Sequence, residues 1–245
     1  MKKSRLDLLL VARGLVNSRT KAQAMIKAGL VRADGVVLDK SGIEYAEDMV
    51  LDVTGQPHPW VSRGGMKLAH ALAHFGLNVT GKIAIDVGAS TGGFTDVLLQ
   101  NGATKIYAVD VGHDQLDAKL RANPCVVVME GINARNLTAS EISTPADIVV
   151  CDASFISLTK VLPAALALTA DNAALVTLIK PQFEVGKSLA DKGRGVIRDA
   201  AIHRGVCDSI SDWLGGIGWH VQGVCESPIT GPKGNVEFLL FATKG

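Results

Sequence analysis

The 245-residue sequence predicts an α/β protein built on a doubly wound, mostly parallel β-sheet, with a small basic α+β unit in front of it. Three observations support this prediction. From residue 83 onward, short β-branched apolar runs alternate with stretches of helical apolar spacing. Hydrophobic residues make up 47% of the chain and aromatic residues only 4%, which favours an α/β protein over a β-sandwich. The first 32 residues carry a net charge of +7, against +1 for the whole chain.

We expect the first unit to span residues 1–54 and to contain two short helices and a hairpin. A first helix, residues 6–11, ends at Gly14, and a second, residues 22–28, follows capping residues at 17–20 and ends at Gly29. Asp34-Gly35 lies between two apolar runs and accepts the positive φ of a tight hairpin turn. Basic side chains on such helices can neutralise phosphates, although a solvated helical face is the alternative. The candidate contacts here are Arg5, Arg19, Lys21 and Lys27.

A proline-containing linker at residues 55–61 and a larger domain at residues 62–245 complete the expected organisation. A helix is predicted over residues 62–77, with Lys67 near its beginning. A cation there opposes the helix dipole, so Lys67 is a candidate functional residue, with a surface lysine as the alternative. Arg63, in the Arg-Gly-Gly sequence just before it, is a further candidate contact to a polyanion.

The region from Ile83 to Leu99 predicts a strand, a glycine-rich loop and the start of a helix. Gly88, Gly92 and Gly93 remove Cβ atoms where the backbone bends tightly or lies against a ligand. The spacing Asp-x-Gly-x-x-x-Gly-Gly differs from the dinucleotide pattern and from the phosphate loop, so no pyrophosphate site is indicated. This loop is the main candidate for a ligand site.

Four further strands are predicted to end at polar side chains. Residues 105–109 end in Asp110, about 20 residues past the glycine loop, where a carboxylate can accept hydrogen bonds from ribose hydroxyls. Residues 125–129 lead into Glu130, and residues 146–151 and 173–179 end at Asp152 and Lys180. In a doubly wound sheet such strand ends form the ligand site.

The chain then continues with a mobile basic loop at residues 182–197, a helix at 198–214 and strands at 219–226 and 236–242. An ordinary surface connection is the alternative for the loop. Lys187 and Arg194 in this loop are candidate contacts to a polyanion. The four cysteines show no Cys-x-x-Cys pair, and His70 and His74 have no partner motif, so we predict no metal site.

The glycine loop resembles the first motif of S-adenosylmethionine-dependent methyltransferases. The resemblance implies a Rossmann-like, seven-stranded class I methyltransferase domain with S-adenosylmethionine as cofactor. The cofactor contacts that it implies are Asp86, Gly88, Ser90, Gly92, Gly93, Phe94, Asp110, Val111, Glu130, Asn133 and Asp152.

Three further patterns carry a resemblance. The residues from Arg5 to Gly35 resemble the S4-type RNA-binding module. Lys67, Asp152, Lys180 and Glu237 resemble the catalytic tetrad of FtsJ-like ribose 2′-O-methyltransferases. Nearly the whole chain resembles the TlyA family, often labelled haemolysins, through Val-Ser-Arg-Gly-Gly-Met-Lys67, Leu-Ile-Lys180-Pro-Gln-Phe-Glu and Pro-Lys-Gly-Asn-Val-Glu237-Phe. The resemblance implies methylation of a cytidine ribose in ribosomal RNA, in the large subunit or also in the small one.

A ribose hydroxyl is a poor nucleophile, so its proton must be accepted as it attacks the sulfonium methyl. Lys180, after an apolar strand, is the candidate base; alternatively it stays cationic and stabilises the forming alkoxide. The rival functions are a non-catalytic ribosome assembly factor and a membrane-active haemolysin. No apolar stretch is long enough to cross a bilayer and no signal-peptide core is evident, so we predict a cytoplasmic protein.

Overall fold

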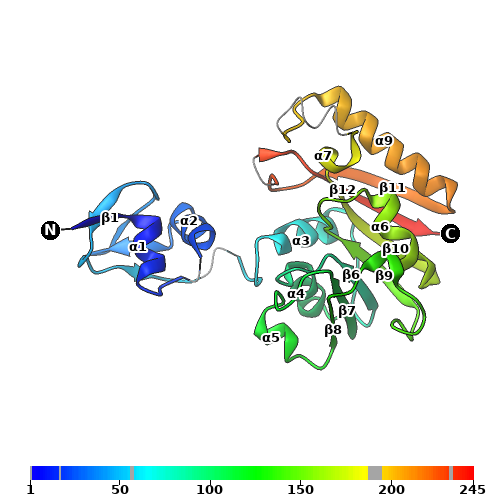
Figure 1. Cartoon of the computed structure of the whole chain (residues 1–245), viewed down its shortest axis with the longest axis horizontal. Helices are drawn as coiled ribbons and strands as arrows, with labels where there is room; N and C mark the ends of the chain where they lie inside the picture. The colour runs from blue at the N-terminus through cyan, green and yellow to red at the C-terminus, as the bar shows by residue number, and fades with distance from the viewer. Residues whose placement is uncertain (1, 17, 56–57, 187–194, 232–233) are drawn as a thin grey trace. The chain divides into compact units, whose positions relative to one another are not determined.

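The computed structural model describes residues 2–16, 18–55, 58–186, 195–231 and 234–245, and it divides into two compact units, Met1–Pro59 and Trp60–Gly245 (Figure 1). The division lies within the predicted linker at 55–61. In the described part of the chain, no helix combines the length and the apolar character needed to cross a membrane.

The first unit packs two helices against short strands. Helices α1 (Leu6–Ala12) and α2 (Arg19–Lys27) cover a core that includes Leu10, Ile26 and Val31. Strand β1 (Lys3–Arg5) pairs with β4 (Glu44–Ala46), and β2 (Val31–Ala33) lies between β3 (Val36–Val37) and β5 (Asp52–Val53).

The predicted turns of this unit are present. Asp34 and Gly35 have φ values of 47° and 79°, as a tight hairpin between β2 and β3 requires, and Ser18 caps α2 by accepting from the Lys21 backbone N–H. Strands β1, β4 and β5 were not predicted. They have two or three residues each and include polar side chains, so no apolar alternation marks them.

The second unit contains a seven-stranded sheet in the order β11-β12-β10-β9-β6-β7-β8. Strands β6 (Ile83–Val87), β7 (Lys105–Asp110), β8 (Val126–Glu130), β9 (Ala146–Cys151) and β10 (Thr169–Ile179) run parallel. Strand β12 (Phe238–Lys244) is antiparallel to both β10 and β11 (Trp219–Glu226). The mostly parallel, doubly wound sheet predicted from the sequence is confirmed.

Helices cover both faces of this sheet, and successive strand residues alternate between two cores. Ala84 packs with α3 (Gly64–His74) and α4 (Gly93–Gln100), whereas its neighbour Ile85 packs with α6 (Leu158–Ala167) and α9 (Ala200–Gly216). The short elements α5 (Ala118–Arg121), η1 (Ala134–Asn136) and α7 (Pro181–Glu184) follow β7, β8 and β10 (Figure 1). Strand β10 begins four residues before its predicted start, across a register shift between Thr169 and Ala174.

Candidate active site

Two lysines and two carboxylates meet at the carboxyl edge of the sheet. Asp152 and Lys180 directly follow the parallel strands β9 and β10, so both lie at the same edge. Because β12 is antiparallel, Glu237 reaches this edge from the residue before that strand. Lys67 comes from the first turns of α3, which packs on the same sheet.

The four side chains form one continuous chain of ion pairs. Lys67 Nζ lies 2.8 Å from Glu237 Oε2 and 3.2 Å from Asp152 Oδ2, and Lys180 Nζ lies 2.6 Å from Asp152 Oδ1. Lys67, Lys180 and Glu237 are only 5%, 6% and 1% exposed. Burial of a charge costs much unless it is paired, so the balance of two cations and two anions allows these groups to share a partly dry site.

Lys180 has three acceptors around its ammonium group. Besides the Asp152 carboxylate, it donates to the Asp152 backbone oxygen at 3.1 Å and to Ser154 Oγ at 2.8 Å. Two hydrogen bonds and one ion pair therefore fix the position of the Lys180 amine at the end of β10. Ser154 was not among the predicted site residues. Only its position two residues after a strand-terminal acid could have pointed to it.

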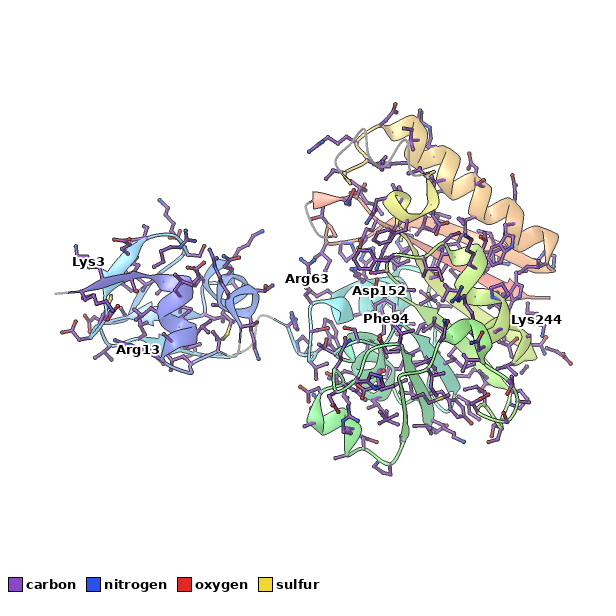
Figure 2. All side chains as sticks on the ribbon, in the orientation of Figure 1. Lys3, Arg13, Arg63, Phe94, Asp152 and Lys244 are labelled. Atoms are coloured by element: carbon purple, nitrogen blue, oxygen red, sulfur yellow. The ribbon has the colours of Figure 1, made fainter. Side chains whose placement is uncertain are left out.

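Two cavities meet beside this cluster. The smaller, of about 240 Å³, is lined by Lys67, Lys180 and Glu237 together with the glycine loop, and the larger, of about 610 Å³, extends past the ends of β7 and β8. Figure 2 labels Arg63, Phe94 and Asp152, which all line the smaller cavity. The residues that line both cavities are Gly88, Ser90, Asp152 and Ser154.

The glycine loop provides the wall between these cavities. Gly88 has a φ of 81°, and a Cβ there would lie 3.0 Å from the Ala153 Cα, so the loop approaches the end of β9 closely. Ser90 is in the left-handed region at a φ of 48°, and its backbone N–H donates to Asp110 Oδ2 at 2.8 Å. The carboxylate at the end of β7 therefore fixes the loop while it also lines the larger cavity.

Most of the predicted cofactor residues line a cavity. Gly93 and Phe94 line the smaller one, and Asp110, Val111 and Asn133 the larger. The Asn133 side chain also caps the following turn by accepting from the Arg135 backbone N–H.

Three predicted cofactor contacts, Asp86, Gly92 and Glu130, line neither of these two cavities, and their contact with a cofactor stays a prediction. Asp86 is fully buried beneath the loop, accepts a 2.6 Å hydrogen bond from Thr95 Oγ1, and has its pKa raised to about 7 by burial. Gly92, at a φ of 95°, is the residue just before α4 and leaves room for Leu120.

Glu130, the third of these residues, supports the loop after β7. It accepts from the backbone N–H groups of Asp114, Gln115 and Leu116. Its pKa is lowered to about 2, first by the Arg121 guanidinium and then by these N–H groups.

Phe155, an aromatic residue that lines the larger cavity, was not among the predicted site residues. Phe155 is 89% exposed and has a left-handed φ of 64°, which is rare for a bulky residue. Its ring lies 5.1 Å from that of Phe183 in α7. An exposed, conformationally strained aromatic beside a site is suited to packing against a planar ligand. In the sequence it stands three residues after Asp152, within the Cys-Asp-Ala-Ser-Phe-Ile segment that resembles the TlyA family.

The candidate RNA contacts fall into two groups. In the first unit, Arg5 and Arg19 both pair with buried Asp7, at 3.1 and 2.8 Å, while Lys27 is exposed and Lys21 is partly exposed. In the second unit, Arg63 lines the smaller cavity. Lys187, Arg194 and the middle half of the predicted basic loop, residues 187–194, lie outside the described residues.

A glycine loop after β6, the middle one of the five parallel strands, with ligand cavities at the carboxyl edge of the sheet, defines the second unit as a Rossmann-like methyltransferase domain. The chain belongs to the FtsJ-like methyltransferase family, whose model matches residues 60–244. Residues 4–51 match the S4 domain.

Relatives are similar over nearly the full length. The chain is 45% identical over 241 residues to the 16S/23S rRNA (cytidine-2′-O)-methyltransferase TlyA of Mycobacterium tuberculosis, covering 98% of this chain and 90% of that protein. It is 40% identical to Hemolysin A of Brachyspira hyodysenteriae, covering 96% and 98%. A solved structure of a Streptococcus thermophilus protein, also named as a hemolysin, superposes with a TM-score of 0.78 at 42% identity, covering 100% and 89%.

Proposed function

We propose that this protein transfers a methyl group from S-adenosylmethionine to the 2′-hydroxyl of a cytidine ribose in ribosomal RNA. The observation that carries the proposal is the convergence of Lys67, Asp152, Lys180 and Glu237 beside the glycine loop. Family membership supports methyl transfer, and the activity named for the M. tuberculosis relative supports a ribose in ribosomal RNA as the target.

The larger cavity suits the adenosine part of the proposed cofactor. Its volume of about 610 Å³ lies in the range of small-molecule sites, and it combines the Asp110 carboxylate with apolar walls from Ile132 and Ile156. Asp110 would accept from the ribose hydroxyls, and Gly88 leaves the backbone close to the ligand. When bound, S-adenosylmethionine supplies a methyl group on a cationic sulfur, and a reaction of this kind needs no metal ion.

In the smaller cavity we assign the residues to holding and activating the hydroxyl. Lys180, held by hydrogen bonds to the Asp152 backbone oxygen and Ser154 and by its ion pair with Asp152, orients the 2′-oxygen and stabilises negative charge as it develops there. When the methyl group passes to the 2′-oxygen, a C–O bond would form and the methyl–sulfur bond would break, leaving a neutral thioether. The attacking oxygen becomes acidic in this step, and Asp152 is the neighbouring carboxylate that would accept its proton. Lys67 and Glu237 hold Asp152 in position. Most of the acceleration then comes from alignment.

The first unit supplies RNA affinity in this proposal. An S4-type unit with exposed basic side chains attracts phosphates with little dependence on sequence, so it would dock a structured RNA while the second unit modifies one ribose. The substrate is expected to be a ribosomal subunit or its RNA, most simply the large subunit. Such a substrate also implies that the enzyme acts in the cytoplasm.

The test is methyl transfer from isotopically labelled S-adenosylmethionine to large subunits, small subunits and free ribosomal RNA from cells that lack the gene. A methylated 2′-hydroxyl leaves an alkali-resistant dinucleotide, which identifies the position. We expect label on a cytidine ribose with the intact protein, and loss of more than about 100-fold of the activity in Lys180→Met, with RNA binding retained. The matched control, Lys105→Met at the amino end of β7, should remain active.

The outcomes separate the alternatives. RNA binding by the intact protein without any methylation would support a non-catalytic assembly factor. Label on a base rather than a ribose would refute the assignment of the nucleophile. Leakage of dye-loaded liposomes with pure protein, unaffected by Lys180→Met, would support a membrane-active protein instead.

A further inference from the structure

We propose that His70, His74 and Cys225 form a zinc-binding site that ties helix α3 to strand β11, away from the tetrad. One ligand atom from each of the three side chains lies within 4.8 Å of the other two. The tetrad, the cavities and the S4-type unit leave these three residues without an assigned role.

The two histidines are presented by the helix in a ligand-like arrangement. Residues four apart on a helix lie on the same face, and two histidines with this spacing are a recurrent way to hold Zn²⁺. Their rings are stacked, with centroids 5.7 Å apart and planes inclined by 21°. His74 is exposed and His70 is partly buried, so the pair is open to solvent.

The thiol comes from a strand far along the chain. Cys225 lies on β11, which occurs at the end of the sheet order, next to β12. The burial of β11 alternates, and Gly223 and Cys225 share its partly buried face. A Cβ at Gly223 would lie 3.0 Å from the Phe75 ring, so this face of the strand contacts the chain directly after His74.

The donor set identifies the ion. Zn²⁺ accepts imidazole nitrogen and thiolate sulfur together, at about 2.0–2.3 Å in tetrahedral geometry, with water able to complete four ligands. Ligand atoms within 4.8 Å of one another need only small side-chain rotations to converge on such an ion. Binding requires that the thiol of Cys225 lose its proton, which the ion itself promotes. Mg²⁺ and Ca²⁺ prefer oxygen and do not fit this set.

The absence of a metal site predicted from the sequence is therefore revised by this proposal. The spacing of the two histidines was visible in the sequence, but their partner Cys225 was not. Cys225 comes near helix α3 only when strand β11 joins the sheet. Such an ion would fix the carboxyl end of the helix whose amino end carries Lys67.

The test uses the full chain, freed of metal with a chelator and titrated with Co²⁺ alone. We expect one ion per chain, with the visible bands of a tetrahedral ion and a thiolate-to-cobalt charge-transfer band in the near ultraviolet. Zn²⁺ should then displace Co²⁺ and abolish both signals. Cys225→Ser should lose the charge-transfer band. His74→Ala should weaken Co²⁺ binding by more than about 100-fold, which exceeds the usual effect of replacing a residue that only hydrogen-bonds to a metal ligand.

Two control variants make the result specific. Cys125→Ser removes a different thiol, and His220→Ala removes an exposed histidine from the same strand, so both should titrate like the unchanged protein. Because His74 is exposed, its replacement should leave folding intact, which circular dichroism can verify. The proposal is wrong if the unchanged chain gives no charge-transfer band, if the band survives in Cys225→Ser, or if His74→Ala binds as tightly as the control variants.

Discussion

Replacing Lys67 with methionine should destabilise the second unit, because it leaves a buried carboxylate unpaired. The side chain of Glu237 is 0% exposed, and Lys67 Nζ at 2.8 Å is its partner through Oε2. Its other oxygen, Oε1, has no hydrogen-bond partner in the described part of the chain. Breaking one side of a buried ion pair costs about 3–5 kcal/mol, which corresponds to a change of more than about 100-fold in the unfolding equilibrium.

The neighbouring pair sharpens this prediction. Asp152 keeps Lys180 at 2.6 Å when Lys67 is removed, so the loss falls mainly on Glu237. Adding Glu237→Gln to Lys67→Met removes the stranded charge and should recover part of the stability. In a double-mutant cycle the coupling should be about 2 kcal/mol, within the range found for residues in direct contact. Neither Lys67→Met nor the double variant should catalyse methyl transfer, because both lack the Lys67 ammonium that holds Asp152 in position.

Urea unfolding followed by tryptophan emission is a suitable assay. Trp60, Trp213 and Trp219 are the three tryptophans of the chain, and all belong to the second unit, so the signal follows that unit alone. Lys82→Met, at an exposed position, is the control and should change stability by less than about 0.5 kcal/mol. A cost below about 1 kcal/mol for Lys67→Met, or strict additivity in the cycle, would refute the reasoning.

Three further predictions concern other parts of the chain. Burial raises the pKa of Asp86 to about 7, so between about pH 4 and pH 7 the folded state holds a proton that the unfolded state has released. The free energy of unfolding should therefore fall by about 1.4 kcal/mol for each unit by which the pH rises through this range. Asp86→Asn should remove this slope in urea unfolding measured across pH, and an unchanged slope would contradict the assignment. Gly93→Ala places a Cβ 2.9 Å from the Gly65 backbone nitrogen and should weaken S-adenosylmethionine binding at least about tenfold by calorimetry. Gly205→Ala lies in open space on α9 and should add about 0.5–1 kcal/mol of stability. Equal cofactor affinity in the two variants would show that the close packing at Gly93 is not needed for binding. Lys27→Ala should reduce the salt dependence of RNA binding by about one unit of log–log slope, and Lys105→Ala should not; identical slopes would remove Lys27 from the RNA surface.

Local pattern was sufficient for the elements and for much of the site. Ile83–Val87 and the glycines after it predicted the central strand and its loop, because apolar periodicity and glycine placement act over a few residues. The carboxyl ends of strands could be located in the same way, which is why Asp110, Asp152 and Lys180 were found. Short polar strands such as β1 carry no such pattern and were missed.

Tertiary structure alone decided which side chains meet and what each one does there. Sequence patterns did not show that strand alternation places Asp86 beneath the loop, or that Arg121 and three backbone N–H groups contact Glu130. The acceptor set of Lys180, including Ser154, also depends on how two strand ends pack together.

The sequence by itself therefore determined the α/β class, the glycine loop and the positions of Asp152 and Lys180 at strand ends, because each depends on residue type and local spacing, whereas the grouping of Lys67 and Glu237 with them came from the resemblance to FtsJ-like enzymes. The fold decided that Lys67 pairs with Glu237 and that Asp152 joins the two lysines. Those pairings connect residues far apart in the chain, so they exist only once the sheet brings its strand ends together and excludes enough water to make pairing necessary.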